Sequence, residues 1–159
     1  MISRPTERDI PAIVALNNMF APEGKTLHRT PQFVEEHLPD YLVLRGESGR
    51  VLGCVALDEY SPSLVELIGL AVHPSARGRG YGVMLIEEIT DLARRRGYDE
   101  IFATSFSEAI FEACGFLKEK LDEFPEKVLR YTRIDRTEVE MAEKHCFSRV
   151  LRETHEAAA

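Results

Sequence analysis

The stretch Ala71-Val-His-Pro-Ser-Ala-Arg-Gly-Arg-Gly-Tyr-Gly82 decides the fold of this chain. It places a glycine-rich turn between an apolar strand predicted over residues 64–72 and an amphipathic helix predicted over residues 82–96. The first N–H groups of a helix have no acceptors within the helix, and the helix dipole makes that end positive. The turn is therefore a candidate site for pyrophosphate, although glycine spacing alone fits a flexible surface turn equally well.

Helix and strand patterns alternate on both sides of this segment. Gly69 interrupts the strand before the turn and predicts a bulge or a close backbone approach there. Hairpin strands followed by a strand, a helix and a strand indicate a single α/β or α+β domain with a mixed sheet. The predicted elements are helices over residues 6–17, 31–37 and 108–114 and strands over residues 41–44, 51–58, 99–104 and 116–121.

Composition limits the class of protein. The 159 residues are enough for one domain and too few for two, and 44% of them are hydrophobic, as in soluble globular proteins. No apolar run approaches the roughly 20 residues that cross a bilayer, and the charged N-terminus lacks a signal-peptide core, so we expect a cytoplasmic protein without a membrane partner. The net charge of −7 argues against a nucleic-acid partner. Cys54, Cys114 and Cys146 form no C-x-x-C pair, so we expect buried thiols and no metal site.

Two motifs together resemble a known family. Arg77-x-x-Gly80-x-Gly82, after Leu70-Ala-Val-His-Pro74 and before a helix, resembles the acetyl-CoA signature of the GNAT family of N-acetyltransferases. Phe111-Glu-Ala-Cys-Gly-Phe116 is similar to that family's short helix and following strand, and the element order agrees over residues 1–122. The resemblance implies a mixed central sheet with splayed middle strands, flanked by helices, in a domain over residues 1–141. It makes residues 137–141 the last strand and leaves residues 142–159 as a C-terminal helical tail.

Four further segments resemble the acetyltransferase domain of N-acetylglutamate synthases. They are residues 23–30, 51–57, 60–62 and 124–128, and their order and spacing agree with that domain. The resemblance implies acetyl transfer from acetyl-CoA to the α-amino group of glutamate, as in arginine biosynthesis. Another amine, such as a peptide N-terminus or a polyamine, stays open as the acceptor. So does an acyl-CoA-binding regulator without catalysis, because Phe111 stands where many family members have a tyrosine.

The resemblance also assigns the cofactor. The pantetheine arm would lie along the strand edge formed by Leu70, Ala71 and Val72, where a backbone N–H polarises the thioester carbonyl. These three residues also fit an ordinary core strand, and a strand can have the structural role and the cofactor role at once. The remaining residues expected at acetyl-CoA are Arg77, Gly78, Arg79, Gly80, Tyr81, Gly82 and Phe111.

A base and an acid are needed for the transfer. Glu66 is the candidate base, because strand alternation puts it on one face with apolar residues, and a carboxylate among apolar neighbours tends to have a raised pKa. A glutamate turned to solvent is the alternative. Ser105 or Ser107 could protonate the leaving thiolate, although Ser105 with Glu108 also resembles a helix capping box. The apolar residues expected on the face of Glu66 are Leu64, Ile68, Leu70 and Val72.

A carboxylate-bearing acceptor needs fixed cations. The resemblance assigns Arg29 in the loop over the pocket, and Arg133 and Arg136 farther along, to the acceptor's carboxylates, while each also fits an ordinary surface arginine. His28 and Lys25 in the same loop receive no role, and His73 before a proline is expected to serve the turn. An apolar stripe over residues 138–155 packs on its own domain or on a second copy, so a homodimer stays open.

Overall fold

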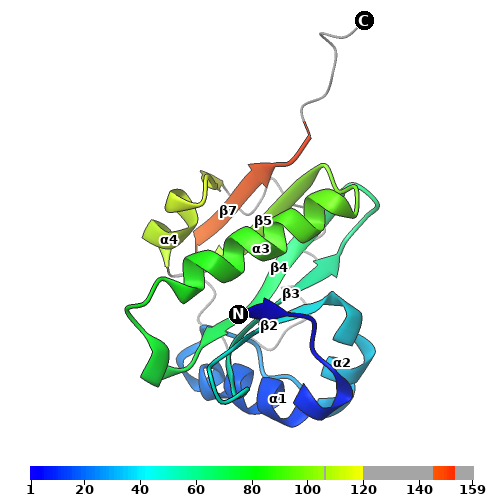
Figure 1. The fold of residues 1–159 in the computed structure, drawn as a ribbon. Helices are drawn as coiled ribbons and strands as arrows, with labels where there is room; N and C mark the ends of the chain where they lie inside the picture. Colours follow the sequence, from blue (N-terminus) through cyan, green and yellow to red (C-terminus); the bar gives the residue numbers. More distant parts are fainter. Residues whose placement is uncertain (106, 120–144, 153–159) are drawn as a thin grey trace, which may run out of the picture.

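The computed structural model describes residues 1–105, 107–119 and 145–152, which fold around one seven-stranded sheet (Figure 1). Its order is β1-β2-β3-β4-β5-β7-β6. Only β4 and β5 run parallel, and the other neighbours are antiparallel, so the predicted mixed sheet is confirmed. The strands are β1 (Ile2–Ser3), β2 (Tyr41–Arg45), β3 (Val51–Glu59), β4 (Leu64–Val72), β5 (Glu100–Ser105), β6 (Leu117–Glu119) and β7 (His145–Val150).

Helices cover both faces of the sheet, each over its own core (Figure 1). On one face, Ile13 and Leu16 of α1 (Ile10–Met19) and Val34 of α2 (Pro31–Glu36) pack against the sheet. On the other, α3 (Tyr81–Arg95) and α4 (Glu108–Ala113) bury Leu85 and Phe111 in a larger cluster. The 3-10 helices are η1 (Glu7–Asp9), η2 (Ala21–Glu23), η3 (Leu38–Asp40) and η4 (Pro74–Ala76).

The two parallel strands separate halfway along their length. β4 pairs with β5 only where Leu64–Glu66 face Glu100–Phe102. Beyond that point β4 continues beside β3 to Val72, and β5 continues beside β7 to Ser105. This is the splay expected from the family resemblance, and it leaves one edge of β4 open toward a space that other segments line.

Gly69 forms a bulge in β4, and this bulge changes which side chains of the strand face each of the two cores. Its φ is +61°, and the register with β3 shifts between Ile68, opposite Ala56, and Ala71, opposite Cys54. The extra residue breaks the alternation, so Leu70 and Val72 pack with the α3 cluster while Ile68 and Ala71 pack with the α1 cluster. The prediction that Leu70 and Val72 share the face of Glu66 is therefore wrong, because it assumed an unbroken strand.

The end of the described chain differs from the prediction of a helical tail. His145–Val150 form β7, inserted between β5 and β6. Cys146 and Phe147 are adjacent and both buried, against Phe102 on one side and the α3 cluster on the other. A strand whose two faces are both covered buries consecutive side chains, one on each face. The apolar spacing that predicts a helix therefore fits such a strand equally well. The strand predicted over residues 137–141 and residues 142–144 and 153–159 of the proposed tail lie outside the described residues.

The three cysteines and His73 have the surroundings that the sequence predicts for them. Cys54, Cys114 and Cys146 are all buried. None of the helices in the described ranges has the length and apolar character needed to span a bilayer. His73 does serve the turn, since its Nδ1 accepts from the Ser75 N–H at 3.1 Å at the start of η4.

Candidate active site

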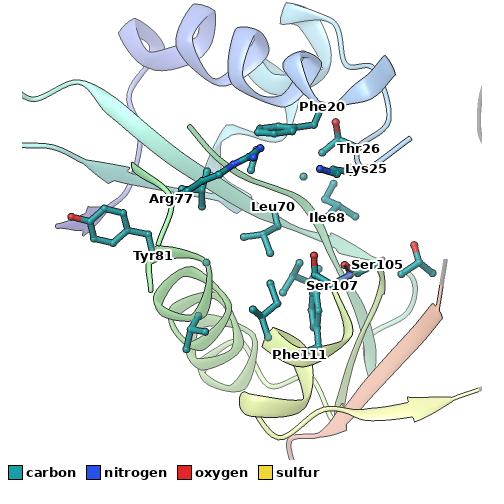
Figure 2. Close-up of a pocket in the computed structure, with 18 of the residues that line it drawn as sticks. Phe20, Lys25, Thr26, Ile68, Leu70, Arg77, Tyr81, Ser105, Ser107 and Phe111 are labelled. Carbon is teal, nitrogen blue, oxygen red and sulfur yellow. Dashed lines mark hydrogen bonds between the residues drawn. The ribbon is translucent and has the colours of Figure 1, made fainter. Parts of the chain in front are cut away.

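A cleft of about 560 Å³ opens where β4 and β5 separate. Its size lies within the roughly 300–1,000 Å³ typical of small-molecule sites. Figure 2 shows Phe20, Lys25 and Thr26 on one side of it and Ser105, Ser107 and Phe111 on the other. The cleft thus combines the loop after α1, the open edge of β4, the turn before α3, and the start of α4.

The glycine-rich turn forms one end of the cleft as a cradle of backbone. Gly78 and Gly80 both have φ of +77°, a conformation that side-chain-bearing residues rarely adopt, and a Cβ added to either would meet no atom within 4 Å. Gly80 caps α3, whose first helical bond runs from the Met84 N–H to the Gly80 carbonyl at 3.1 Å. The N–H groups of the first turn before Met84 therefore remain for an external acceptor. This cradle fits a pyrophosphate.

The two arginines of the turn go to different places. Arg77 lines the cleft, and its guanidinium lies 5.6 Å from the ring centroid of Phe20 (Figure 2). Arg79 instead lines a second surface pocket together with Arg50 at the β2–β3 turn. Tyr81 borders both pockets, and its ring points away from the centre of the cleft in Figure 2. Of the predicted cofactor residues, Arg79 is the one that the structure does not bring to the cleft.

The open edge of β4 runs along the cleft. Leu70, Ala71 and Val72 all line it, beyond the last residue pair that β4 shares with β5. Backbone groups on an unpaired strand edge can bind an extended ligand by strand addition, as the amides of a pantetheine arm would require. These residues also take part in the two cores, so the structural and the cofactor roles coincide.

Glu66 is buried in the cleft wall, with an exposed fraction of 4%. The alternative of a glutamate turned to solvent is therefore wrong. The Tyr60 hydroxyl donates a hydrogen bond to Glu66 Oε1 at 3.0 Å. Across the sheet, Glu66 is opposite Asp58 of β3 and Phe102 of β5. The sequence indicates Tyr60 only as part of a resembling segment and does not predict this contact, because the geometry of the turn between the two residues cannot be derived from it.

Ser105 and Ser107 both line the cleft, at the end of β5 and the start of α4. Ser105 Oγ accepts from the Ser107 N–H at 2.9 Å. Because α4 starts at Glu108 with Ser107 as its N-cap, the capping box between Ser105 and Glu108 is wrong. Phe111 also lines the cleft, is 1% exposed and stacks on Phe147 at 5.3 Å, so an apolar ring occupies this position.

The acceptor loop, residues 24–30, closes the other end of the cleft. Lys25, Thr26 and Arg29 of this loop line it. The guanidinium of Arg29 lies 4.1 Å from the ring centroid of Phe33 on α2, and the Lys25 ammonium pairs with Glu23 at 3.0 Å. Among the described lining residues, Lys25, Arg29 and Arg77 are cationic, and Glu66 is the one carboxylate. The described lining therefore carries more cationic than anionic side chains, although the whole chain has a net charge of −7.

Two asparagines at the end of α1 hold this loop in place. Asn18 Oδ1 accepts from the Arg29 N–H at 2.8 Å, and Asn18 Nδ2 donates to the Arg29 carbonyl at 2.9 Å. Asn17 Nδ2 donates to the Leu27 carbonyl at 2.7 Å. These bonds fix the backbone from which the Arg29 side chain extends. Arg133 and Arg136, the other predicted acceptor residues, lie outside the described residues.

The cysteines do not offer a nucleophile to the cleft. None of the three lines it, and burial raises the pKa of the Cys54 thiol to about 12. Burial also raises the pKa of Cys114. A thiol with such a pKa is protonated at neutral pH and reacts poorly. Among the described residues, moreover, no group of three or more His, Cys, Asp or Glu side chains is arranged to hold a metal ion.

Comparison with known proteins agrees with this arrangement. Residues 10–119 match the family model described as the acetyltransferase (GNAT) family. An uncharacterised N-acetyltransferase of Chlorobaculum tepidum is 30% identical over 77% of this chain and 78% of its own length. The amino-acid acetyltransferase of Neisseria meningitidis serogroup A is 36% identical over 74% of this chain, but only 27% of its own length is matched.

Solved structures extend the agreement to the fold. N-acetylglutamate synthase from Neisseria gonorrhoeae, crystallised with coenzyme A and N-acetyl-glutamate, superposes with a TM-score of 0.81 at 30% identity. The match covers 96% of this chain and 35% of that one. A Mycobacterium tuberculosis protein in complex with CoA has a TM-score of 0.83 at 21% identity over 94% of this chain and 98% of its own, which shows the shared fold. The chain therefore belongs to the GNAT acetyltransferase family, as an acetyl-CoA-dependent N-acetyltransferase.

Proposed function

We propose that this chain transfers the acetyl group of acetyl-CoA to the α-amino group of a small acidic amino acid, with L-glutamate as the first candidate. One observation carries the proposal: a single cleft holds a backbone cradle for phosphate, a buried carboxylate and an acceptor loop with two cationic side chains. The similarity to amino-acid acetyltransferases of Neisseria supports it. By the same likeness, the product would feed arginine biosynthesis in the cytoplasm.

The roles of the residues follow from the chemistry of the transfer. Acetyl-CoA supplies an activated thioester. Glu66 accepts a proton from the acceptor's ammonium group, so that the neutral amine can attack the thioester carbonyl carbon directly. A backbone N–H of the Leu70–Val72 edge donates to the carbonyl oxygen as negative charge develops there. Ser105 or Ser107 gives a proton to the sulfur as the carbon–sulfur bond breaks, so that CoA leaves as the thiol, and the same serine takes up the second proton that the acetylated nitrogen loses.

Recognition of the acceptor depends on local cations. A dicarboxylate is repelled at long range by a protein of net charge −7, so nearby cations must supply both affinity and selectivity. Arg29 is our candidate for one carboxylate, because its guanidinium can bind both carboxylate oxygens at once. Arg133 and Arg136 remain proposed contacts for the side-chain carboxylate.

Conservative replacement of Arg29 tests the acceptor. We expect Arg29→Lys to raise the KM for glutamate about tenfold, because lysine keeps the charge but loses the two-pronged contact. The KM for acetyl-CoA should change little. Arg94→Lys is the matched control, since Arg94 pairs with Asp91 at 2.6 Å on α3 and does not line the cleft. If Arg29→Lys behaves like Arg94→Lys in steady-state kinetics, Arg29 does not bind the acceptor.

Replacement of Glu66 tests the base. Glu66→Gln keeps the size of the side chain but cannot take up the proton, so kcat should fall by about 100-fold while acetyl-CoA binding survives. Glu59→Gln is the control, because Glu59 also accepts a tyrosine hydroxyl, from Tyr98 at 2.9 Å, and does not line the cleft. A Glu66→Gln enzyme with the wild-type rate and pH profile would remove Glu66 from the mechanism.

A further inference from the structure

Tyr60 is locked in place beside the proposed base by three independent contacts. Its backbone N–H donates to the Leu64 carbonyl at 2.9 Å, which closes the turn between β3 and β4. Its ring meets the buried ring of Phe102 edge-on, with centroids 5.1 Å apart. Its hydroxyl donates to Glu66 Oε1 at 3.0 Å. A ring that its backbone bond and its neighbour already hold in place loses little further freedom when its hydroxyl binds a partner.

From this geometry we propose that Tyr60 is a positioning residue for Glu66, which it keeps ionised and correctly oriented for proton uptake. The inference rests on the proposed function, in which Glu66 is the base. A hydrogen bond donated to a carboxylate favours its charged form, and only the charged form accepts a proton. The same bond restricts rotation of the carboxylate within the cleft wall. Tyr60 therefore acts through Glu66 and needs no contact with the substrates.

The groups that face Glu66 from neighbouring elements explain why such a donor is needed. Asp58, the cross-strand neighbour on β3, is a like charge that opposes ionisation of Glu66. Phe102 of β5, also opposite Glu66, presents an apolar ring, which opposes ionisation as well. The Tyr60 hydroxyl, which comes from the turn between β3 and β4, favours ionisation, as do the cations Lys25, Arg29 and Arg77 that line the same cleft.

The molecule contains a matched pair for comparison. The Tyr98 hydroxyl donates to Glu59 Oε1 at 2.9 Å, nearly the same bond as that from Tyr60 to Glu66. Tyr98 packs in the α3 cluster, and neither Tyr98 nor Glu59 lines the cleft. Removal of the hydroxyl from Tyr98 therefore deletes a similar hydrogen bond with no effect expected on the proton transfer.

The test compares pH–rate profiles of Tyr60→Phe and Tyr98→Phe, using whichever amine the wild-type enzyme acetylates fastest. In Tyr60→Phe, which keeps the ring contact with Phe102, the acid limb of kcat/KM should move to higher pH by about half a unit or more, and kcat should fall about fivefold. The KM for acetyl-CoA should stay within about twofold of wild type, a change worth under about 0.5 kcal/mol. Tyr98→Phe should keep the wild-type profile.

A second substitution should shift the acid limb of kcat/KM in the opposite direction, and it keeps every atom of the hydrogen bond. 3-Fluorotyrosine incorporated at position 60 has a more acidic hydroxyl than tyrosine, donates more strongly, and should move the acid limb to lower pH. Because 3-fluorotyrosine keeps both the ring and the hydroxyl, this variant still tests the role of Tyr60 if Tyr60→Phe proves unstable. Wild-type profiles in both variants would overturn the role of Tyr60.

Failure of this inference can be told apart from failure of the base assignment. If Glu66→Gln abolishes the acid limb while both Tyr60 variants keep it unmoved, Glu66 stands as the base and Tyr60 has no positioning role. If Glu66→Gln itself keeps the limb and the rate, the base assignment fails and the inference on Tyr60 fails with it. Loss of the limb in Glu66→Gln together with the paired shifts at position 60 supports both.

Discussion

One end of the cleft is formed mainly by backbone and the other mainly by side chains. The end proposed for the cofactor is backbone: two glycines with φ of +77° in the turn before α3, followed by the first turn of that helix. The acceptor end is made of side chains, with Lys25 and Arg29 extending from a loop. That loop has no regular structure of its own between residues 27 and 30, and it is held by Asn17 and Asn18 of α1.

The difference teaches how one fold can keep a cofactor and change a substrate. A backbone cradle depends on a few local positions that must be glycine, so the same cradle can serve different amine substrates. An acceptor site depends on side chains that separate segments bring together, so it can change without disturbing the cradle. The two ends should therefore respond independently to mutation.

The largest effect is expected at the cradle. Gly80→Val forces a β-branched residue into a φ of +77° and places methyl groups in the open space where a phosphate would lie. We expect the dissociation constant for acetyl-CoA to rise about 30-fold, measured by calorimetry and worth about 2 kcal/mol, because the methyl groups would take the space of the phosphate. Acceptor selectivity should be unchanged.

Gly49→Val is the control for backbone strain. Gly49 has φ of +81° in the turn between β2 and β3, and a Cβ there also meets nothing within 4 Å, but the residue does not line the cleft. It should destabilise the fold and leave acetyl-CoA affinity intact. Equal affinities in the two valine variants would mean that the phosphate binds elsewhere.

A smaller effect is expected at the loop that presents Arg29. Asn18→Ala removes both side-chain bonds to the Arg29 backbone, so the KM for the acceptor should rise about fivefold while acetyl-CoA affinity stays constant. Gln32→Ala on α2 is the control, because it removes an exposed bond to Glu36 that does not touch the loop. A parallel loss of acetyl-CoA affinity in Asn18→Ala would break the independence of the two ends.

The smallest effect is expected at Asp9, which lies just before α1 and does not line the cleft. The Asp9 carboxylate accepts from Arg45 Nη1 at 2.9 Å, and this bond lowers the pKa of Asp9 from its usual value. A lowered pKa adds stability above about pH 4, which is lost as the pH falls through the folded value. Asp9→Asn should therefore lower the melting temperature by about 3 °C at pH 7 and by less near pH 3. An equal loss at both pH values would show that the charge is not responsible.

Local sequence patterns predict the secondary structure at the glycine-rich end of the cleft. Gly80 and Gly82, beside an apolar strand and a helix with one apolar face, predict the turn and the helix, whereas assigning acetyl-CoA to the turn also needs the family resemblance. The bulge at Gly69 was also predicted, because an isolated glycine within a strand often marks a bulge or a close backbone approach. These features depend on residues close together in sequence, where backbone geometry and periodicity decide the outcome.

Features that depend on distant pairing were not predictable in this way. Apolar residues of β7 repeat at a spacing that fits a helix, and only the neighbours β5 and β6 decide that they form a strand. The bond from Tyr60 to Glu66 depends on the exact turn between β3 and β4. The bulge itself was predicted, but its effect on the facing of Leu70 was not, since a one-residue shift reverses every later side chain.

The most direct test of the proposed function is the choice of acceptor. The purified chain is incubated with acetyl-CoA and an equimolar mixture of glutamate, aspartate, glutamine, lysine, a polyamine and a peptide with a free N-terminus, and the products are identified by mass. We predict that N-acetylglutamate forms fastest and that Arg29→Lys removes this preference. Faster acetylation of a neutral or basic amine would contradict the acceptor assignment and leave only the membership of the acetyltransferase family.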